Sequence, residues 1–357
     1  MRTIGMLAIV LGAGFMLVGQ QPAAKTTGPG IQAAADSKEP DILKTCKTPP
    51  PARGARGGGQ AKGGPPRGAG KGPAPAAAQR DTTVKAIPGV IADGAQWKEI
   101  WQVDGNNADG IIGTNDGGLL IAQNDNSQVI KLDKNGKVSV AYKDTNTGGS
   151  VAMSSKGMLF VANRGIYPSI DELSPKRRKL ADKYMGDPLD CIGTVMNDVT
   201  ADSKGGVYFT MGTVFHADAQ GAITKYGMNL NTNGIMLSAD EKHLFVTNGA
   251  ALAEFDVEKD GSLTNQREFA KLEGGGGDGS TFDSAGRFYI TVGSSINVIS
   301  ADGKVLGVIP TPRGVISAAF SGKDRKMLYA VSRDNAQNKD WIIGIPMIAQ
   351  GAKSRGK

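Results

Sequence analysis

Residues 233–248 read Asn-Gly-Ile-Met-Leu-Ser-Ala-Asp-Glu-Lys-His-Leu-Phe-Val-Thr-Asn, the clearest copy of a pattern that recurs along the chain. An Asn and a small residue lead into an apolar run, which a polar turn separates from a second apolar run. Residues 197–210 and 278–291 repeat the pattern, and looser copies begin at Asp109, Ser150 and Ser317. Successive copies start 36 to 47 residues apart, which is the length of a four-stranded blade. The sequence therefore predicts an all-β, six-bladed β-propeller.

The first residues of four copies carry oxygen side chains. In a propeller the innermost strands all begin at one end of the central channel, so we expect Asp109, Asn197, Asn233 and Asp278 to converge there. Two carboxylates and two amides suit a hard divalent cation such as Ca²⁺. The alternative interpretation is that Asn and Asp before a small residue form turns and bond to the local backbone.

These segments resemble the SMP-30/gluconolactonase/regucalcin-like (LRE-like) family of six-bladed propellers. The similarity rests on residues 197–210, 233–248 and 278–291 as blade motifs and on residues 317–331 as the closing motif, and it extends from about residue 95 to about residue 346. The resemblance implies one metal ion on the axis. It assigns this metal to Asp109, Asn197, Asn233 and Asp278, with Ca²⁺ expected and Zn²⁺, Mn²⁺ or Mg²⁺ as alternatives.

Three positions depart from the family pattern. The first ligand is usually Glu, whereas this chain has Asp109, which is one methylene shorter. Residues 210–215 run almost directly from one strand to the next, where relatives carry a loop over the substrate, so we expect a more open pocket and a different substrate. Val195 stands where animal members carry Arg.

The resemblance implies metal-dependent hydrolysis of a sugar lactone or related small ester. The cation would polarise the ring carbonyl, and a carboxylate would activate water. By resemblance, Asp278 is the candidate base, and Arg164, Asn163 and Asn124 are candidate substrate-binding residues that could equally occupy turns or the surface.

Other chemistry finds little support in the sequence. A G-x-S-x-G motif is absent, and the two histidines, His216 and His243, are expected to pack or lie at the surface. The alternative function is a non-catalytic secreted propeller that binds carbohydrate or protein at the cell surface. A third is an ester or lactone hydrolase of the drug-responsive-protein kind.

Composition predicts four regions. Residues 1–24 resemble a signal peptide, with a retained anchor as the alternative, and residues 25–83 form a linker rich in Gly, Pro, Ala, Lys and Arg that is expected to be disordered. Residues 84–349 form the propeller, and residues 350–357 form a basic tail. We therefore expect an exported protein, periplasmic or extracellular.

The net charge of +7 does not indicate a nucleic-acid partner. Residues 1–80 carry 11 of the 41 Lys and Arg and residues 351–357 carry 3, so residues 81–350 hold 27 basic against 31 acidic groups. The linker could contact an anionic envelope surface or act as a solvated spacer. We expect a monomer that acts on a small lactone, with Cys46 and Cys191 as unpaired thiols.

Overall fold

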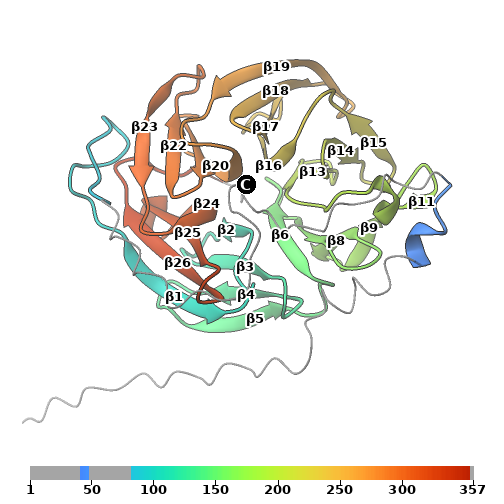
Figure 1. Cartoon of the computed structure of the whole chain (residues 1–357), viewed down its shortest axis with the longest axis horizontal. Coiled ribbons are helices and arrows are strands. Elements are labelled where there is room, and N and C mark those ends of the chain that lie inside the picture. Colours follow the sequence, from blue (N-terminus) through green and yellow to red (C-terminus); the bar gives the residue numbers. More distant parts are fainter. Residues whose placement is uncertain (1–40, 48–81, 354–357) are drawn as a thin grey trace, which may run out of the picture.

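The computed structural model describes residues 41–47 and 82–353. Six four-stranded antiparallel sheets are arranged around a central channel, as Figure 1 shows. The predicted all-β, six-bladed propeller is confirmed. The predicted signal peptide, most of the predicted linker and the last four residues of the basic tail lie outside the described residues.

In blades 1 to 3 the first strand in the sequence is the innermost and the last is the outermost. Blade 1 contains β2 (Ile111–Gly113), β3 (Leu119–Gln123), β4 (Gln128–Leu132) and β5 (Val138–Tyr142). Blade 2 contains β6 (Gly148–Met153), β7 (Leu159–Asn163), β8 (Ser169–Ser174) and β9 (Arg178–Ala181). Blade 3 contains β12 (Val199–Ala201), β13 (Val207–Thr210), β14 (Val214–Ala217) and β15 (Ile223–Tyr226).

The second half of the ring follows the same order. Blade 4 contains β16 (Thr232–Leu237), β17 (His243–Asn248), β18 (Ala251–Val257) and β19 (Leu263–Lys271). Blade 5 contains β20 (Gly277–Phe282), β21 (Phe288–Val292), β22 (Ser295–Ile299) and β23 (Val305–Pro310). Blade 6 contains β24 (Gly314–Ser321), β25 (Met327–Asp334), β26 (Lys339–Pro346) and β1 (Lys98–Asp104).

The ring closes through β1, which precedes blade 1 in sequence and pairs with β26 of blade 6. Trp97 donates from its indole nitrogen to the carbonyl of Pro310 at 2.8 Å, which ties the entry segment to blade 5. Both ends of the propeller thus share one sheet, so neither can separate without opening the ring.

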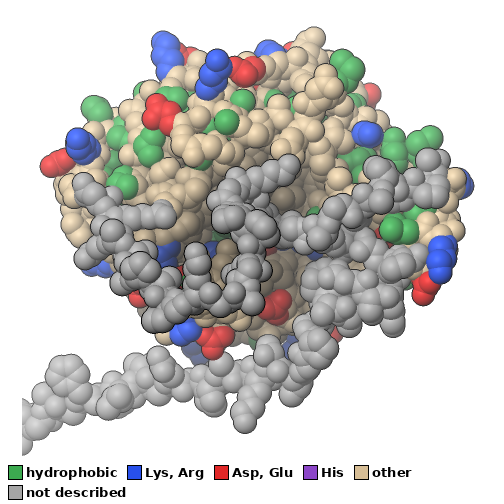
Figure 2. Space-filling view, in the orientation of Figure 1, with side chains coloured by type: hydrophobic (Ala, Val, Ile, Leu, Met, Phe, Trp, Pro, Cys, Tyr) green, Lys and Arg blue, Asp and Glu red, His purple; other side chains and the backbone are tan. Residues whose placement is uncertain are grey.

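Apolar side chains fill the space between neighbouring blades. In β3 all five residues are buried, because both faces of the blade pack against other sheets. Between blades 2 and 3, the rings of Phe209 and Phe215 stack with centroids 5.3 Å apart, and Phe160 joins the same cluster. Figure 2 shows acidic and basic side chains interspersed along the rim of the visible face, in keeping with the near balance of charge in residues 81–350. No described helix is long and apolar enough to span a membrane.

Two short strands and a 3-10 helix interrupt the chain between blades 2 and 3. They are β10 (Lys183–Tyr184), β11 (Asp187–Pro188) and η1 (Leu189–Ile192), and a second 3-10 helix, η2 (Lys323–Arg325), follows β24. Residues 41–47 contact this insertion: the backbone nitrogen of Lys47 donates to Asp187 at 3.1 Å, and its ammonium donates to the carbonyl of Met185 at 3.0 Å.

A disulfide joins Cys46 to Cys191 in η1, with Cα atoms 5.6 Å apart. The expectation of two unpaired thiols was therefore wrong. It assumed that nothing would hold the linker cysteine near a blade, whereas residues 41–47 dock on the β10–β11 insertion and Ile42 is buried there. Spacing along the chain carries no information about such a contact between segments 145 residues apart.

Breaking this disulfide should destabilise the protein. Replacing Cys46 and Cys191 by Ser is expected to lower the free energy of unfolding by about 2–4 kcal/mol, because the bond restricts the unfolded chain over a long loop. Thermal unfolding of the oxidised protein, the reduced protein and the double variant tests this. Equal unfolding midpoints for the three, with intact mass proving the bond in the first, would contradict the prediction.

Candidate active site

The innermost strands β2, β6, β12, β16, β20 and β24 contact one another around the channel, and each has an extra residue near its start or in the two residues before it. In blade 4, Asn233 and Gly234 together face the single residue Thr247. The pairing shifts at the same place in blades 2, 5 and 6, and the hydrogen bonds of blades 1 and 3 have the same form. Such a β-bulge takes a side chain out of the strand alternation. From blade 1 to blade 6 the bulged residues are Asp109, Gly149, Asn197, Asn233, Asp278 and Ile316.

The four oxygen-bearing residues predicted to converge thus occupy equivalent positions on four blades. Asp109, Asn197, Asn233 and Asp278 are all partly exposed, while the residues that follow them are buried. The side chains are therefore presented at one end of the channel.

Small residues after the bulge allow the blades to approach closely. A Cβ on Gly110 would lie 2.7 Å from the Cα of Ser150 in blade 2, and one on Gly279 would lie 2.6 Å from the carbonyl oxygen of Ile316 in blade 6. A Cβ on Gly234 would overlap the carbonyl of Asp278. Substitution at these glycines would push neighbouring innermost strands apart and move the side chains beside them.

Threonines at or next to the end of the second strand of blades 3, 4 and 5 secure the bulges. Thr247 accepts from the nitrogen of Gly234 at 2.7 Å, and Thr291 donates to the carbonyl of Gly279 at 2.8 Å. Thr210 donates to the carbonyl of Asn233 in the next blade. The recurring Thr of the repeat therefore positions the residues at the channel end.

Asp109 is held by two of the predicted substrate residues. Arg164 and Asn124 each donate to its Oδ2 at 2.7 Å, from Nη1 and Nδ2 respectively. Burial opposes ionisation of Asp109, but the positive charges of Arg164 and Arg333 outweigh it and hold its pKa below the usual value. Asp109 is therefore a carboxylate at neutral pH.

Arg164 fills the gap that blade 2 leaves in the ring. Gly149, the bulged residue of that blade, has no side chain, and a Cβ there would overlap the guanidinium of Arg164. From this place Nη1 bonds to Asp109, while Nη2 donates to the carbonyl of Asn197 and lies 3.4 Å from its Oδ1. The guanidinium thus bridges two of the four predicted metal ligands.

Asp278 has the opposite electrostatic environment from Asp109. Burial raises the pKa of Asp278 to about 7, and the neighbouring carboxylates Asp109 and Asp198 add to the rise, while Arg164 and Arg333 oppose it. Asp278 can therefore take up or release a proton near neutral pH.

Asp198 is a residue that the sequence analysis missed. It is buried and joins three blades: Ser150 donates to its Oδ1, as does the nitrogen of Val199 at 3.0 Å, and the nitrogen of Ile235 donates to Oδ2 at 3.2 Å. The available signal was its place in the repeat, because blades 1, 4 and 5 have Gly where blade 3 has Asp198.

Arg333 was also missed. It lies near the end of β25, with Nε donating to the buried Asp340 at 2.8 Å and Nη2 donating to Asp340 at 3.1 Å and to the carbonyl of Ala108 at 3.1 Å. Its charge also lowers the pKa of Asp109. Nothing in the repeat pattern singles out Arg333, since its relation to the site depends on blade 6 standing beside blade 1.

Asn163 is placed differently from the other predicted substrate residues. Its side chain is 2% exposed and donates to Ser169 across β7 and β8 at 3.1 Å. The structure thus brings together Asp109, Asn124, Arg164 and Asn197, whereas Asn163 bonds within its own blade.

The residues at the channel end fit a divalent cation. Asp109, Asn197, Asn233 and Asp278 offer oxygen ligands of the kind that hard cations prefer. Arg333 is matched by Asp340, so Arg164 is the positive charge left to balance the carboxylates of Asp109, Asp198 and Asp278. This charge balance leaves about two negative charges when all three acids are ionised.

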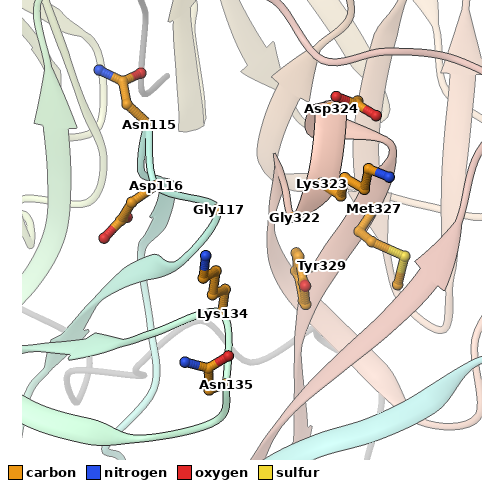
Figure 3. Close-up of a pocket in the computed structure, with 10 residues that line it drawn as sticks. All are labelled: Asn115, Asp116, Gly117, Lys134, Asn135, Gly322, Lys323, Asp324, Met327 and Tyr329. Atoms are coloured by element: carbon orange, nitrogen blue, oxygen red, sulfur yellow. The ribbon is translucent and has the colours of Figure 1, made fainter.

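A polar pocket and a cluster of charged side chains lie at the opposite end of the blades. A pocket of about 510 Å³ between blades 1 and 6 is lined by turn residues after β2, β4 and β24, among them Asp116, Lys134, Lys323 and Asp324 (Figure 3). These turns follow the far ends of their strands. The pocket is therefore separate from the bulges.

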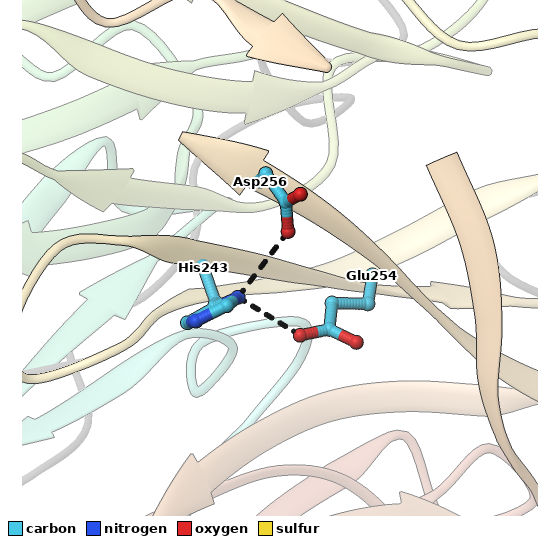
Figure 4. A group of neighbouring side chains, drawn as sticks. All are labelled: His243, Glu254 and Asp256. Atoms are coloured by element: carbon cyan, nitrogen blue, oxygen red, sulfur yellow. Dashed lines mark ion pairs between the residues drawn. The ribbon is translucent and has the colours of Figure 1, made fainter. Parts of the chain in front are cut away.

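His243, at the start of β17, lies 3.0 Å from Glu254 and 3.5 Å from Asp256 of β18 (Figure 4). Arg267 of β19 pairs with both carboxylates, at 2.9 and 2.8 Å, so this group is a network of ion pairs across three strands. The other histidine, His216, is buried and stacks on Tyr208 with ring centroids 4.2 Å apart. Packing and ion pairing thus account for both histidines.

Comparison with known proteins identifies relatives of this architecture. The chain is 32% identical over 124 residues to a 6-deoxy-6-sulfogluconolactonase of Pseudomonas putida, a match covering 32% of this chain and 43% of that protein, so it spans less than half of this relative's length.

Among solved structures, a gluconolactonase from Xanthomonas campestris superposes with a TM-score of 0.62 at 20% identity, covering 74% of this chain and 94% of that one. A regucalcin from Agrobacterium tumefaciens, described as a calcium-binding protein, gives 0.58 at 17% identity, with 72% and 96% covered. At these identities the superpositions establish the fold. The SMP-30/Gluconolactonase/LRE-like region matches residues 139–334, more than half of the sequence, and the chain therefore belongs to that family.

Proposed function

We propose that this protein hydrolyses a sugar lactone or a closely related small ester, using a divalent cation at the channel end. The observation that carries the proposal is the placement of Asp109, Asn197, Asn233 and Asp278 at equivalent bulges on four blades. Turn formation alone would not require oxygen side chains at the same position in four separate sheets. The lactonase named among the relatives supports the same reaction class.

The cation would be held by the same four residues, and we propose Ca²⁺ because all four ligands are hard oxygens. When bound, the ion supplies a Lewis acid for the ring carbonyl. The regucalcin structure, described as a calcium-binding protein, supports this choice.

Asp278 is the proposed general base. In the metal-free protein, burial and the neighbouring carboxylates raise the pKa of Asp278 to about 7, so this carboxylate binds a proton more tightly than an ordinary Asp does. Asp109 cannot take this role, because its pKa is lowered and Arg164 and Asn124 occupy its Oδ2. The two acids therefore differ in function: Asp109 supplies fixed negative charge and Asp278 moves the proton.

The side chains around Asp109 can orient a polyhydroxylated substrate. The Oδ1 of Asn124 and the Nε of Arg164 are buried at this site without a hydrogen-bond partner among the described residues. One is an acceptor and the other a donor, so they match a sugar hydroxyl group. We propose that Asn124 and Arg164 bind substrate, while Asn163 supports the β7–β8 turn that carries Arg164.

We also propose that the protein is exported, as residues 1–24 indicate. The disulfide between Cys46 and Cys191 supports this location, because such bonds persist in oxidising compartments. A calcium site of modest affinity would be occupied outside the cytosol, where this ion is abundant.

The test is hydrolysis of a panel of aldonolactones and simple γ-lactones by the full-length, oxidised protein. We expect turnover with Ca²⁺ to fall at least about 100-fold after chelation and to return when the ion is restored, since the ion stabilises the transition state by several kcal/mol. The intact chain is needed, because a fragment that begins after the linker leaves Cys191 without its partner. Calcium binding without hydrolysis of any member of the panel would refute the enzyme and favour the non-catalytic binding protein.

A further inference from the structure

The side chain of Arg164 lies against two of the proposed metal ligands. Its guanidinium lies over Gly149 and donates to the Oδ2 of Asp109 and to the backbone carbonyl of Asn197. The same Nη2 lies 3.4 Å from the Oδ1 of Asn197, so the guanidinium reaches the side chains of two proposed ligands. The side chain of Arg164 is only 13% exposed, and that of Asp109 only 17%. A partly buried, charge-assisted hydrogen bond of this kind is stronger than a surface ion pair.

We propose that Arg164 is a built-in counter-ion that competes with the divalent cation for Asp109 and Asn197. The inference rests on the proposed metal site and adds to it a control of its affinity. The guanidinium of Arg164 balances the charge of Asp109 and fills the space beside Gly149 of blade 2. A cation that binds the Oδ2 of Asp109 and the Oδ1 of Asn197 must displace the guanidinium, and this displacement weakens its binding.

The geometry of the neighbouring blades explains why the competitor is an arginine on blade 2. A side chain at position 149 would fill the space beside the channel, but Gly149 leaves this space open. The β7–β8 turn places Arg164 there. Backbone hydrogen bonds from Arg164 and Gly165 to residues Thr147 and Asn146, at 3.2 and 3.0 Å, hold the turn. A planar guanidinium can reach Asp109 and Asn197 at once, whereas the ammonium of a lysine is a point charge with a shorter reach.

Calorimetric titration of the metal-free protein with Ca²⁺ tests the competition directly and does not depend on activity. Arg164→Met is expected to bind Ca²⁺ at least tenfold more tightly than the wild type. Arg164→Lys, which retains the charge and loses the bridge, is expected to lie between them. The matched control is Arg178→Met, which removes an arginine of the same blade that pairs with Glu172 at 2.7 Å, and its affinity should equal that of the wild type.

Three results would overturn the proposal. Equal Ca²⁺ affinity in Arg164→Met and wild type would show that the guanidinium does not compete, and an Arg164→Lys affinity equal to wild type would reduce the effect to net charge alone. If Arg164→Met does not fold, the lysine variant decides the question by the same criterion. Ca²⁺ binding to none of these proteins refutes the competition, whereas the lactone panel judges hydrolysis separately.

Discussion

Asp278→Asn is expected to lower kcat for lactone hydrolysis by about 10³-fold. The loss of a general base removes a factor of about 10² to 10⁴, and the amide cannot accept the proton that Asp278 takes near neutral pH. Asn keeps an oxygen that can bind the cation, so Ca²⁺ binding should persist at reduced affinity. Steady-state kinetics at saturating Ca²⁺ and calorimetry measure the two effects separately.

The matched control for Asp278 is Asp302→Asn in the same blade. Asp302 lies in an exposed turn, where it pairs with Lys304 at 2.8 Å, so its replacement should leave kcat unchanged. A decrease of less than about tenfold in kcat for Asp278→Asn, with Ca²⁺ bound and the fold intact, would remove Asp278 from the role of base.

Asp198→Asn is expected to destabilise the propeller by about 3 kcal/mol. The two carboxylate oxygens accept hydrogen bonds from Ser150, from the nitrogen of Val199 and from the nitrogen of Ile235, which belong to blades 2, 3 and 4. An amide has one acceptor oxygen, so its NH₂ group would face a donor inside the protein. The measurement is the free energy of unfolding by chemical denaturation.

The control for Asp198 is Asp218→Asn, in a turn of the same blade. Only the Oδ1 of Asp218 accepts hydrogen bonds there, from Gln220 and Ala222, each at 2.9 Å, and an Asn oxygen can replace it. We expect a change of less than about 0.5 kcal/mol for this variant. Equal stability of the two variants would mean that Asp198 does not tie the three blades together.

The repeat made the fold and part of the site predictable. Each copy carries its own strand and turn signals, so the number of blades follows from their spacing along the chain. Asp109, Asn197, Asn233 and Asp278 could be identified because they stand at the same place in four copies. The β1–β26 closure was also predictable, since a ring of blades must join its ends and the stretch before blade 1 was free to do so.

Other parts of the site required the folded structure. The resemblance suggested Arg164 as a substrate residue, but its bridge between Asp109 and Asn197 depends on the small size of Gly149 and on the facing of blades 1, 2 and 3. Arg333 influences Asp109 because blade 6 stands beside blade 1. Such contacts join residues far apart in the chain, and no local pattern encodes them.

By itself, the sequence determined that this protein is a six-bladed propeller with four oxygen side chains at one end, because those features recur with the period of a blade. Three features depend on the folded ring: the Cys46–Cys191 bond, the opposite pKa shifts of Asp109 and Asp278, and the contact of Arg164 with two proposed ligands. Bond formation, charge balance and burial depend on distances across blades, and these distances exist only once the ring has closed.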